Sequence, residues 1–139
     1  MNVGEGFAGD GANAAHVNTV VGPKEGPVGT AWATALASPS TGHTPFVVVA
    51  RPNVAVKPMT LFVNKASVAS DKHGRLTWGA AQAGVAAGVI DALRAEIVAP
   101  DELLIAAVWV NPDADDEEAV FANNRDATRA ALEAGHDGR

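Results

Sequence analysis

Hydrophobic residues follow two periods along this chain, one typical of strands and one typical of helices. Apolar and β-branched runs predict strands over residues 3–7, 15–21, 46–50, 60–68 and 103–110. Apolar positions repeat every fourth residue from 80 to 97 and predict a helix there. Helices are also predicted over 27–37 and from about residue 113. This order predicts an α+β fold in which helices pack on one face of a sheet, and the first two strands form a hairpin.

Two glycines interrupt the predicted helix over residues 80–97. Gly84 and Gly88 are four residues apart, a spacing that in a membrane would favour helix dimerisation. The longest apolar run, residues 103–110, is far shorter than the roughly 20 residues that span a bilayer. The two glycines therefore predict close packing of the helix on the sheet.

Length and charge limit the function further. The 139 residues predict a single domain over 1–139. The net charge of −6 with scattered lysines and arginines argues against nucleic acid as a partner. The chain contains no cysteine, which excludes disulfides, thiolate zinc sites and cysteine nucleophiles. We expect no membrane helix, and the first residues lack the pattern of a signal peptide, so the predicted location is the cytoplasm.

Polar residues on two predicted strands are the first candidates for chemistry. His16 and Asn18 point to one side of their strand, and Lys65 and Ser67 share a side of another. If the two strands are neighbours, these side chains form one polar patch on an apolar sheet, as small-molecule sites do. Histidine can give or take a proton near neutral pH. A purely structural role, with His16 satisfying a backbone carbonyl or packing at an interface, is the alternative.

Other candidate sites have little support in the sequence. His43, His73 and His136 are predicted to lie in loops or the tail, and no two histidines have the helical spacing of a metal site. The acidic residues 115–118 match the start of a helix better than a metal site. No glycine-rich loop with a following helix and lysine indicates phosphate binding. We therefore expect no metal and no permanently bound cofactor.

Short motifs also resemble a known family. They are VGE (3–5), GDGAN (9–13), AHV (15–17), GHTP (42–45), RPN (51–53), KP (57–58), VNK (63–65), GAAQ (79–82) and AT (127–128). In this nearly collinear series, from Val3 to about Leu132, the chain resembles the formaldehyde-activating enzyme family.

The resemblance implies a carbon-nitrogen lyase of one-carbon metabolism and formaldehyde detoxification. Such an enzyme condenses formaldehyde with the cosubstrate tetrahydromethanopterin to give methylene-tetrahydromethanopterin and water. The resemblance also implies a fold like domain 2 of ribosomal protein S5 and a homopentamer with sites between subunits. It makes His16 the catalytic acid and base. The implied pterin-binding positions are Asn18, Val47, Lys65, Ser67 and Gln82.

At three of these positions the chain differs from the family pattern. Asn18 replaces an aspartate, Ser67 a threonine and Val47 a leucine, so the chain resembles a divergent member. Asparagine keeps an acceptor and gains a donor but loses the negative charge. Two alternatives stay open: a non-catalytic module that binds a reduced pterin, folate or other one-carbon carrier, and an enzyme of this fold with another carrier amine or aldehyde.

Overall fold

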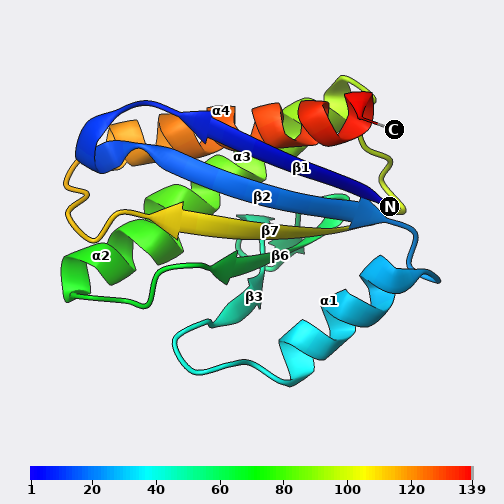
Figure 1. The fold of residues 1–139 in the computed structure, drawn as a ribbon, viewed down its shortest axis with the longest axis horizontal. Coiled ribbons are helices and arrows are strands. Elements are labelled where there is room, and N and C mark those ends of the chain that lie inside the picture. Colours follow the sequence, from blue (N-terminus) through cyan, green and yellow to red (C-terminus); the bar gives the residue numbers. More distant parts are fainter. Residues whose placement is uncertain (139) are drawn as a thin grey trace.

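The computed structural model describes residues 1–138, so the last residue of the predicted domain, Arg139, lies outside the described residues. The strands are β1 (Asn2–Ala8), β2 (Ala15–Gly22), β3 (Pro45–Val47), β4 (Val49–Arg51), β5 (Val54–Ala55), β6 (Met59–Asn64) and β7 (Leu103–Val110). The helices are α1 (Pro27–Ala37), α2 (Asp71–Arg75), α3 (Gln82–Arg94) and α4 (Glu117–Asp137), with a short η1 (Gly11–Asn13) and a π-helical segment η2 (Leu76–Ala81). The α+β class is confirmed (Figure 1).

A mixed sheet organises the molecule. Its strand order is β1-β2-β7-β6-β3; β6 and β7 are parallel and the other neighbours antiparallel. The predicted hairpin is confirmed, because β1 pairs with β2 over its full length. Strands β4 and β5 form a separate two-stranded sheet. The central pair β2 and β7 joins segments that are about 90 residues apart, which brings the hairpin beside β6 across one strand.

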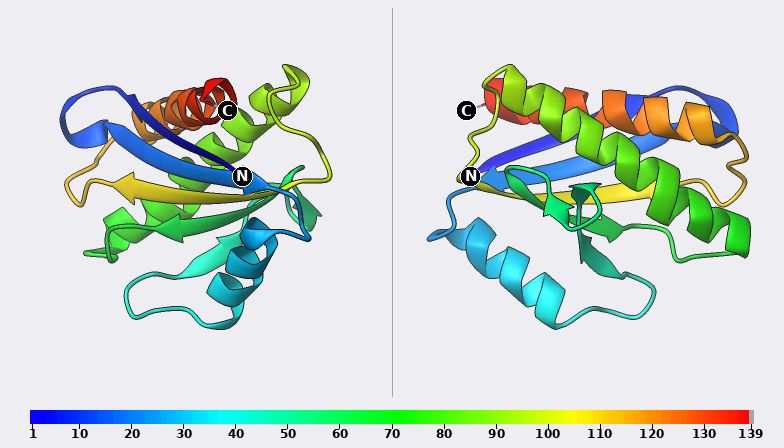
Figure 2. Two further views of the ribbon diagram at one scale, coloured as in Figure 1. Left: turned by 45° about the vertical axis from the view of Figure 1, so that its right-hand side comes forward. Right: turned by 180° about the vertical axis from the view of Figure 1, so that it is seen from behind.

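The hydrophobic core lies between the sheet and the helices α3 and α4. Alternate residues of β2 and β7, such as Val17, Ala106 and Val108, are fully buried and belong to the core. Helix α4 packs on β1, β2 and α3, and Figure 2 shows α3 and α4 together over one face of the sheet. None of the helices within residues 1–138 is both long and apolar enough to cross a membrane.

The prediction that all helices pack on one face is wrong for α1. This helix contacts β2, β7 and β3, and it belongs to the face opposite α3 and α4 (Figure 1). Leu61, which points to that face, is fully buried, and Val63 beside it shares a small depression with Ala35 of α1. Trp32 anchors the helix by donating its indole N–H to the carbonyl of Leu104 at 3.2 Å. The physical reason is the crossover from β2 to β3, which passes over two strands.

Glycines allow close contact between the main elements, but Gly84 and Gly88 do not contact the sheet as their spacing predicts. A Cβ added to Gly84 would lie 2.5 Å from the Phe121 carbonyl oxygen, and one on Gly88 would lie 2.7 Å from that of Arg125. Both carbonyl oxygens belong to α4. The predicted packing of these glycines on the sheet is therefore wrong, and the close contact joins α3 to α4. On β1, a Cβ added to Gly4 would lie 1.8 Å from the carbonyl oxygen of Ala131.

Several element boundaries in the structure differ from the predicted ones. The predicted strand 46–50 is divided between β3 and β4, and the strand predicted over 60–68 ends at Asn64. The side-chain amide of Asn64 donates to the carbonyls of Gly42 and Ala66, which turns the chain out of the sheet. The helix predicted over 80–97 begins earlier, at Asp71, and α3 ends at Arg94. The last helix begins at Glu117, where the carboxylate of Asp116 accepts from Ala119 N.

His73 is buried in α2, so its prediction as a loop residue is wrong; His136 likewise lies within α4 rather than in a tail. The hydroxyl of Ser70 caps α2 by accepting from His73 N at 3.1 Å. The His73 ring accepts from Ala69 N at 3.0 Å through Nδ1, which leaves Nε2–H to donate to the Val110 carbonyl at 2.8 Å. This ring therefore joins the start of α2 to the end of β7.

We expect His73→Phe to lower the free energy of unfolding by about 2 kcal/mol, because the ring volume stays while the buried Val110 carbonyl and the Ala69 N–H lose their partner. Denaturant unfolding followed by circular dichroism measures this value. Exposed His43 provides a matched control: His43→Phe is expected to cost less. An equal loss in both variants would contradict the role given to the buried ring.

Candidate active site

A polar cluster lies on the sheet face that α3 and α4 leave free. It contains Glu5 of β1, His16 and Asn18 of β2, and Lys65, which directly follows β6. Strand alternation turns the first three side chains to this face, and the register sets Glu5 opposite Asn18. Helix α1 covers the other end of the same face, near the end of β2 (Figure 1).

Lys65 connects the two strands that the sequence could not place together. Its backbone N–H donates to the Val108 carbonyl at 2.8 Å, so the β6–β7 ladder extends one residue beyond β6. Its ammonium group reaches over β7 to Nδ1 of His16 at 3.3 Å and makes a short hydrogen bond to Oδ1 of Asn18. His16, Asn18 and Lys65 thus come together within one chain.

Glu5 completes the cluster from the other side. Its Oε2 lies 2.9 Å from Nε2 of His16 and accepts from the Asn18 amide at 3.2 Å. Asn18 therefore uses both ends of its side chain, donating to Glu5 and accepting from Lys65. The asparagine orients the two charged residues relative to each other, which an aspartate could do only at the lysine end.

The partners define the protonation of the His16 ring. A lysine ammonium group has only donors, so with Lys65 charged the Nδ1 atom must offer its lone pair. The ring proton then belongs on Nε2, where the Glu5 carboxylate accepts it. The hydrogen bonds therefore fit a neutral imidazole with its proton directed at Glu5.

Two of the charged groups have shifted pKa values. The hydrogen bonds from His16 and then Asn18 hold the pKa of the Glu5 carboxyl below its ordinary value, so Glu5 stays anionic into the acid range. Burial lowers the pKa of the Lys65 ammonium group, and the charge of Glu5 opposes this effect. Because a lowered lysine pKa weakens the hold on the proton, Lys65 is a stronger acid than an exposed lysine.

Aromatic side chains frame the cluster. The rings of Phe7 and His16 stack with centroids 4.1 Å apart and planes 9° apart, which fixes the plane of the imidazole. Trp109 pairs with His16 in the register between β2 and β7. Phe7 and Val3 remain 66% and 63% exposed, so this side of the sheet presents apolar surface next to charged groups.

The structure separates the other predicted site residues from this cluster. Ser67 is exposed in the loop after β6, so the prediction that it shares a strand face with Lys65 is wrong. Val47 lies on β3, with β7 and β6 between it and β2. Gln82 begins α3, on the opposite side of the sheet, where its Oε1 accepts from Val49 N at 2.9 Å.

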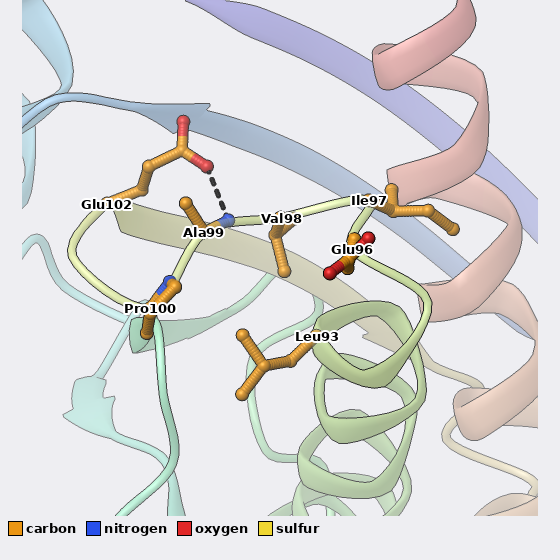
Figure 3. Close-up of a pocket in the computed structure, with 7 residues that line it drawn as sticks. All are labelled: Leu93, Glu96, Ile97, Val98, Ala99, Pro100 and Glu102. Carbon is orange, nitrogen blue, oxygen red and sulfur yellow. Dashed lines mark hydrogen bonds between the residues drawn. The ribbon is translucent and has the colours of Figure 1, made fainter.

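Among the cavities that lie away from the cluster, two adjoin α3. One, of about 400 Å³, lies between the end of α3 and the start of β7 (Figure 3). The Glu102 carboxylate in the lining of this cavity accepts from Ala99 N–H at 2.8 Å. None of the predicted site residues lines the cavity. A second cavity, of about 420 Å³, is lined by Gln82, Arg51 and apolar residues of α3. The polar cluster itself is a surface feature of the single chain.

Two residues of this region were not singled out as site residues from the sequence. The sequence points to Glu5 only as part of the VGE motif. The predicted hairpin, together with strand alternation, is a signal that could have placed Glu5 on the same side as His16. Asn64 is buried, and its side-chain amide bonds both to Ala66, next to Lys65, and to Gly42 and Thr44 of the segment before β3. Sequence periodicity has no signal for such a contact.

Metal binding has no candidate site in the described part of the chain. Residues 1–138 contain no group of three or more histidine, aspartate or glutamate side chains that could hold an ion. The carboxylate, imidazole, amide and ammonium groups of the polar cluster can supply hydrogen bonding, charge stabilisation and proton transfer.

Comparison with known proteins gives one consistent result. A family model described as formaldehyde-activating enzyme (Fae) matches residues 3–139. A protein named 5,6,7,8-tetrahydromethanopterin hydro-lyase, from Methanosarcina barkeri, is 39% identical over 142 residues, which cover 99% of this chain and 79% of the relative. The bifunctional enzyme Fae/Hps of Methanosphaera stadtmanae is 40% identical over 139 residues, 97% of this chain and 34% of the relative. The chain spans about a third of the length of such bifunctional relatives.

Proposed function

Because the chain belongs to the formaldehyde-activating enzyme family, we propose that it condenses formaldehyde with tetrahydromethanopterin to methylene-tetrahydromethanopterin and water. The family match over nearly the whole chain carries this proposal. The name of the Methanosarcina relative, a tetrahydromethanopterin hydro-lyase, gives the same pterin and the same reaction type. Formaldehyde and the reduced pterin are then both substrates, and the reaction needs no resident cofactor.

His16 is the proposed proton donor and acceptor. An amine of the pterin adds to formaldehyde to give a carbinolamine, and the hydroxyl group of this intermediate can leave as water only if it receives a proton. The imidazole is suited to this transfer near neutral pH. The second pterin nitrogen then closes the ring and releases a proton, which returns to the imidazole, so the protons balance.

Lys65, Asn18, Ser67, Val47 and Gln82 are the proposed pterin-binding residues. The contact of Lys65 with His16, and that of Asn18 with Lys65, support their place beside the reacting atoms. Holding the two pterin nitrogens and the aldehyde together contributes to the rate as well, because it replaces an encounter between free molecules.

We also propose that the protein is a cytoplasmic homopentamer with a fold like domain 2 of ribosomal protein S5. The separation of Gln82 from His16 within one chain supports a site between subunits, since a neighbouring copy could supply the missing residues. The exposed Val3 and Phe7 beside the cluster provide apolar surface for such a contact. Sedimentation velocity should give five times the 14.1 kDa mass of one chain, and a monomer would contradict the assembly.

Stopped-flow absorbance tests the reaction directly. Formaldehyde and tetrahydromethanopterin are mixed with and without protein, and the protein is expected to accelerate product formation above the spontaneous rate. The same mixing with tetrahydrofolate tests the choice of carrier. Absence of acceleration with tetrahydromethanopterin would refute the proposed function, and calorimetric binding of reduced pterins would then distinguish a carrier-binding module from an unrelated role.

A further inference from the structure

Glu5 is the one acidic side chain that contacts the proposed proton donor among the described residues. The charged groups that face His16 are Glu5 from β1 and Lys65 from the segment after β6. Strand β7, packed on the other side of β2, presents Trp109 and Ala107, which carry no charge. The imidazole is thus bracketed by one carboxylate and one ammonium group.

Protonation of His16 changes these two contacts in opposite directions. At Nδ1 a new N–H would face the ammonium group of Lys65 across 3.3 Å, which sets two donors and two positive charges against each other. At Nε2 the hydrogen bond to Glu5, 2.9 Å long, becomes an ion pair and strengthens. Without a negative partner, the imidazolium would have Lys65 as its nearest charge.

We propose that Glu5 is a positioning residue for this reaction, which supplies the counter-charge for the His16 imidazolium and so directs proton donation through Nδ1. This inference rests on the proposed function. Because Nε2–H stays on Glu5, the proton that leaves is the one on Nδ1. When the carbinolamine hydroxyl takes the place of the Lys65 ammonium group at Nδ1, this proton passes to the departing hydroxide and forms water. The ring then returns to the neutral state that the hydrogen bonds fit.

Asn18 supports this arrangement. Its amide donates to the same Oε2 atom of Glu5 that contacts His16, at 3.2 Å, and so holds the carboxylate in place. The amide itself carries no charge. In this cluster the negative charge next to the histidine therefore comes from β1 rather than from position 18.

Glu5→Gln tests the proposal, because the amide oxygen can still accept from Nε2–H while the charge is lost. Near pH 8 we expect the protein-dependent rate to fall about tenfold, with the alkaline limb of the pH–rate profile displaced to lower pH, as for loss of an adjacent opposite charge. KM for the pterin should change little, since Glu5 is not among the proposed pterin-binding residues. Glu25→Gln, in the exposed loop after β2, is the matched control and should behave as wild type.

A second measurement does not depend on activity. Nitrogen-15 NMR of the histidine rings should show the Nε2–H tautomer of His16 in the wild type, and in Glu5→Gln the ring should take up its proton at lower pH. Unchanged pH–rate and NMR profiles in Glu5→Gln would overturn the inference even if the wild-type protein is active. A rate loss that is equal at all pH values and accompanied by a higher KM would also overturn it. A wild type without activity would refute the proposed function, and the NMR comparison would then still show whether Glu5 stabilises the His16 imidazolium.

Discussion

His16→Ala is expected to lower the protein-dependent rate of methylene-tetrahydromethanopterin formation by about two to four orders of magnitude, the range that general acid–base catalysis contributes. The variant removes the imidazole between Glu5 and Lys65, so the carbinolamine must take its proton from water. The remaining acceleration would measure what binding of both substrates contributes. Stopped-flow traces at saturating pterin, corrected for the spontaneous reaction, give this value.

The matched control is His136→Ala on α4, the helix that packs on the other face of the sheet. This variant should retain the wild-type rate. Circular dichroism of both variants must show the same helix and strand content. A His16→Ala protein that stays as fast as the wild type would remove the imidazole from the mechanism, and proton donation by Lys65 would become the next hypothesis.

Gly4→Ala is expected to lower the free energy of unfolding by at least about 3 kcal/mol, the upper part of the range for overpacked sites. The added methyl carbon would lie 1.8 Å from the Ala131 carbonyl oxygen and 3.0 Å from the backbone nitrogen of Gly135. Both are backbone atoms of α4, so no side-chain rotation can relieve the clash and β1 must move away from the helix. Denaturant unfolding at a fixed protein concentration measures the loss, since oligomers gain stability with concentration.

Gly79→Ala is the control for the loss of a glycine. Nothing lies within 4 Å of a Cβ added at Gly79, which sits in the helical segment η2. Alanine there should leave stability unchanged or raise it by up to about 1 kcal/mol, because it favours helix over the unfolded chain. If Gly4→Ala were as stable as Gly79→Ala, the close contact between β1 and α4 would have to be discarded.

Local periodicity predicts much of this fold. The predicted strand 103–110 and helix 27–37 agree with β7 and α1, and the alternation in Ala15–Gly22 places His16 and Asn18 on the correct face. These features depend on neighbouring residues alone. The sheet order, which brings Lys65 to His16, depends on pairing between distant segments and is not contained in any local pattern.

The errors have physical reasons of the same kind. Ser70 caps the short helix that contains His73, but the burial of His73 results from contact with Val110, 37 residues away. Gly84 and Gly88 indicate a close approach without identifying the partner, which is α4. The face of the sheet on which α1 packs follows from a crossover that passes over two strands. The amino-acid composition of α1 does not identify this face.

Strand β1 lies at an edge of the sheet, where it pairs only with β2. It carries Glu5 and Phe7, the two residues that hold the His16 ring from outside, whereas the ring itself belongs to an interior strand. Because β1 also packs closely on α4, both supports of the His16 ring depend on the contact between this strand and that helix. On warming, activity should be lost in step with this contact, and amide hydrogens of β1 should exchange with solvent as the activity falls.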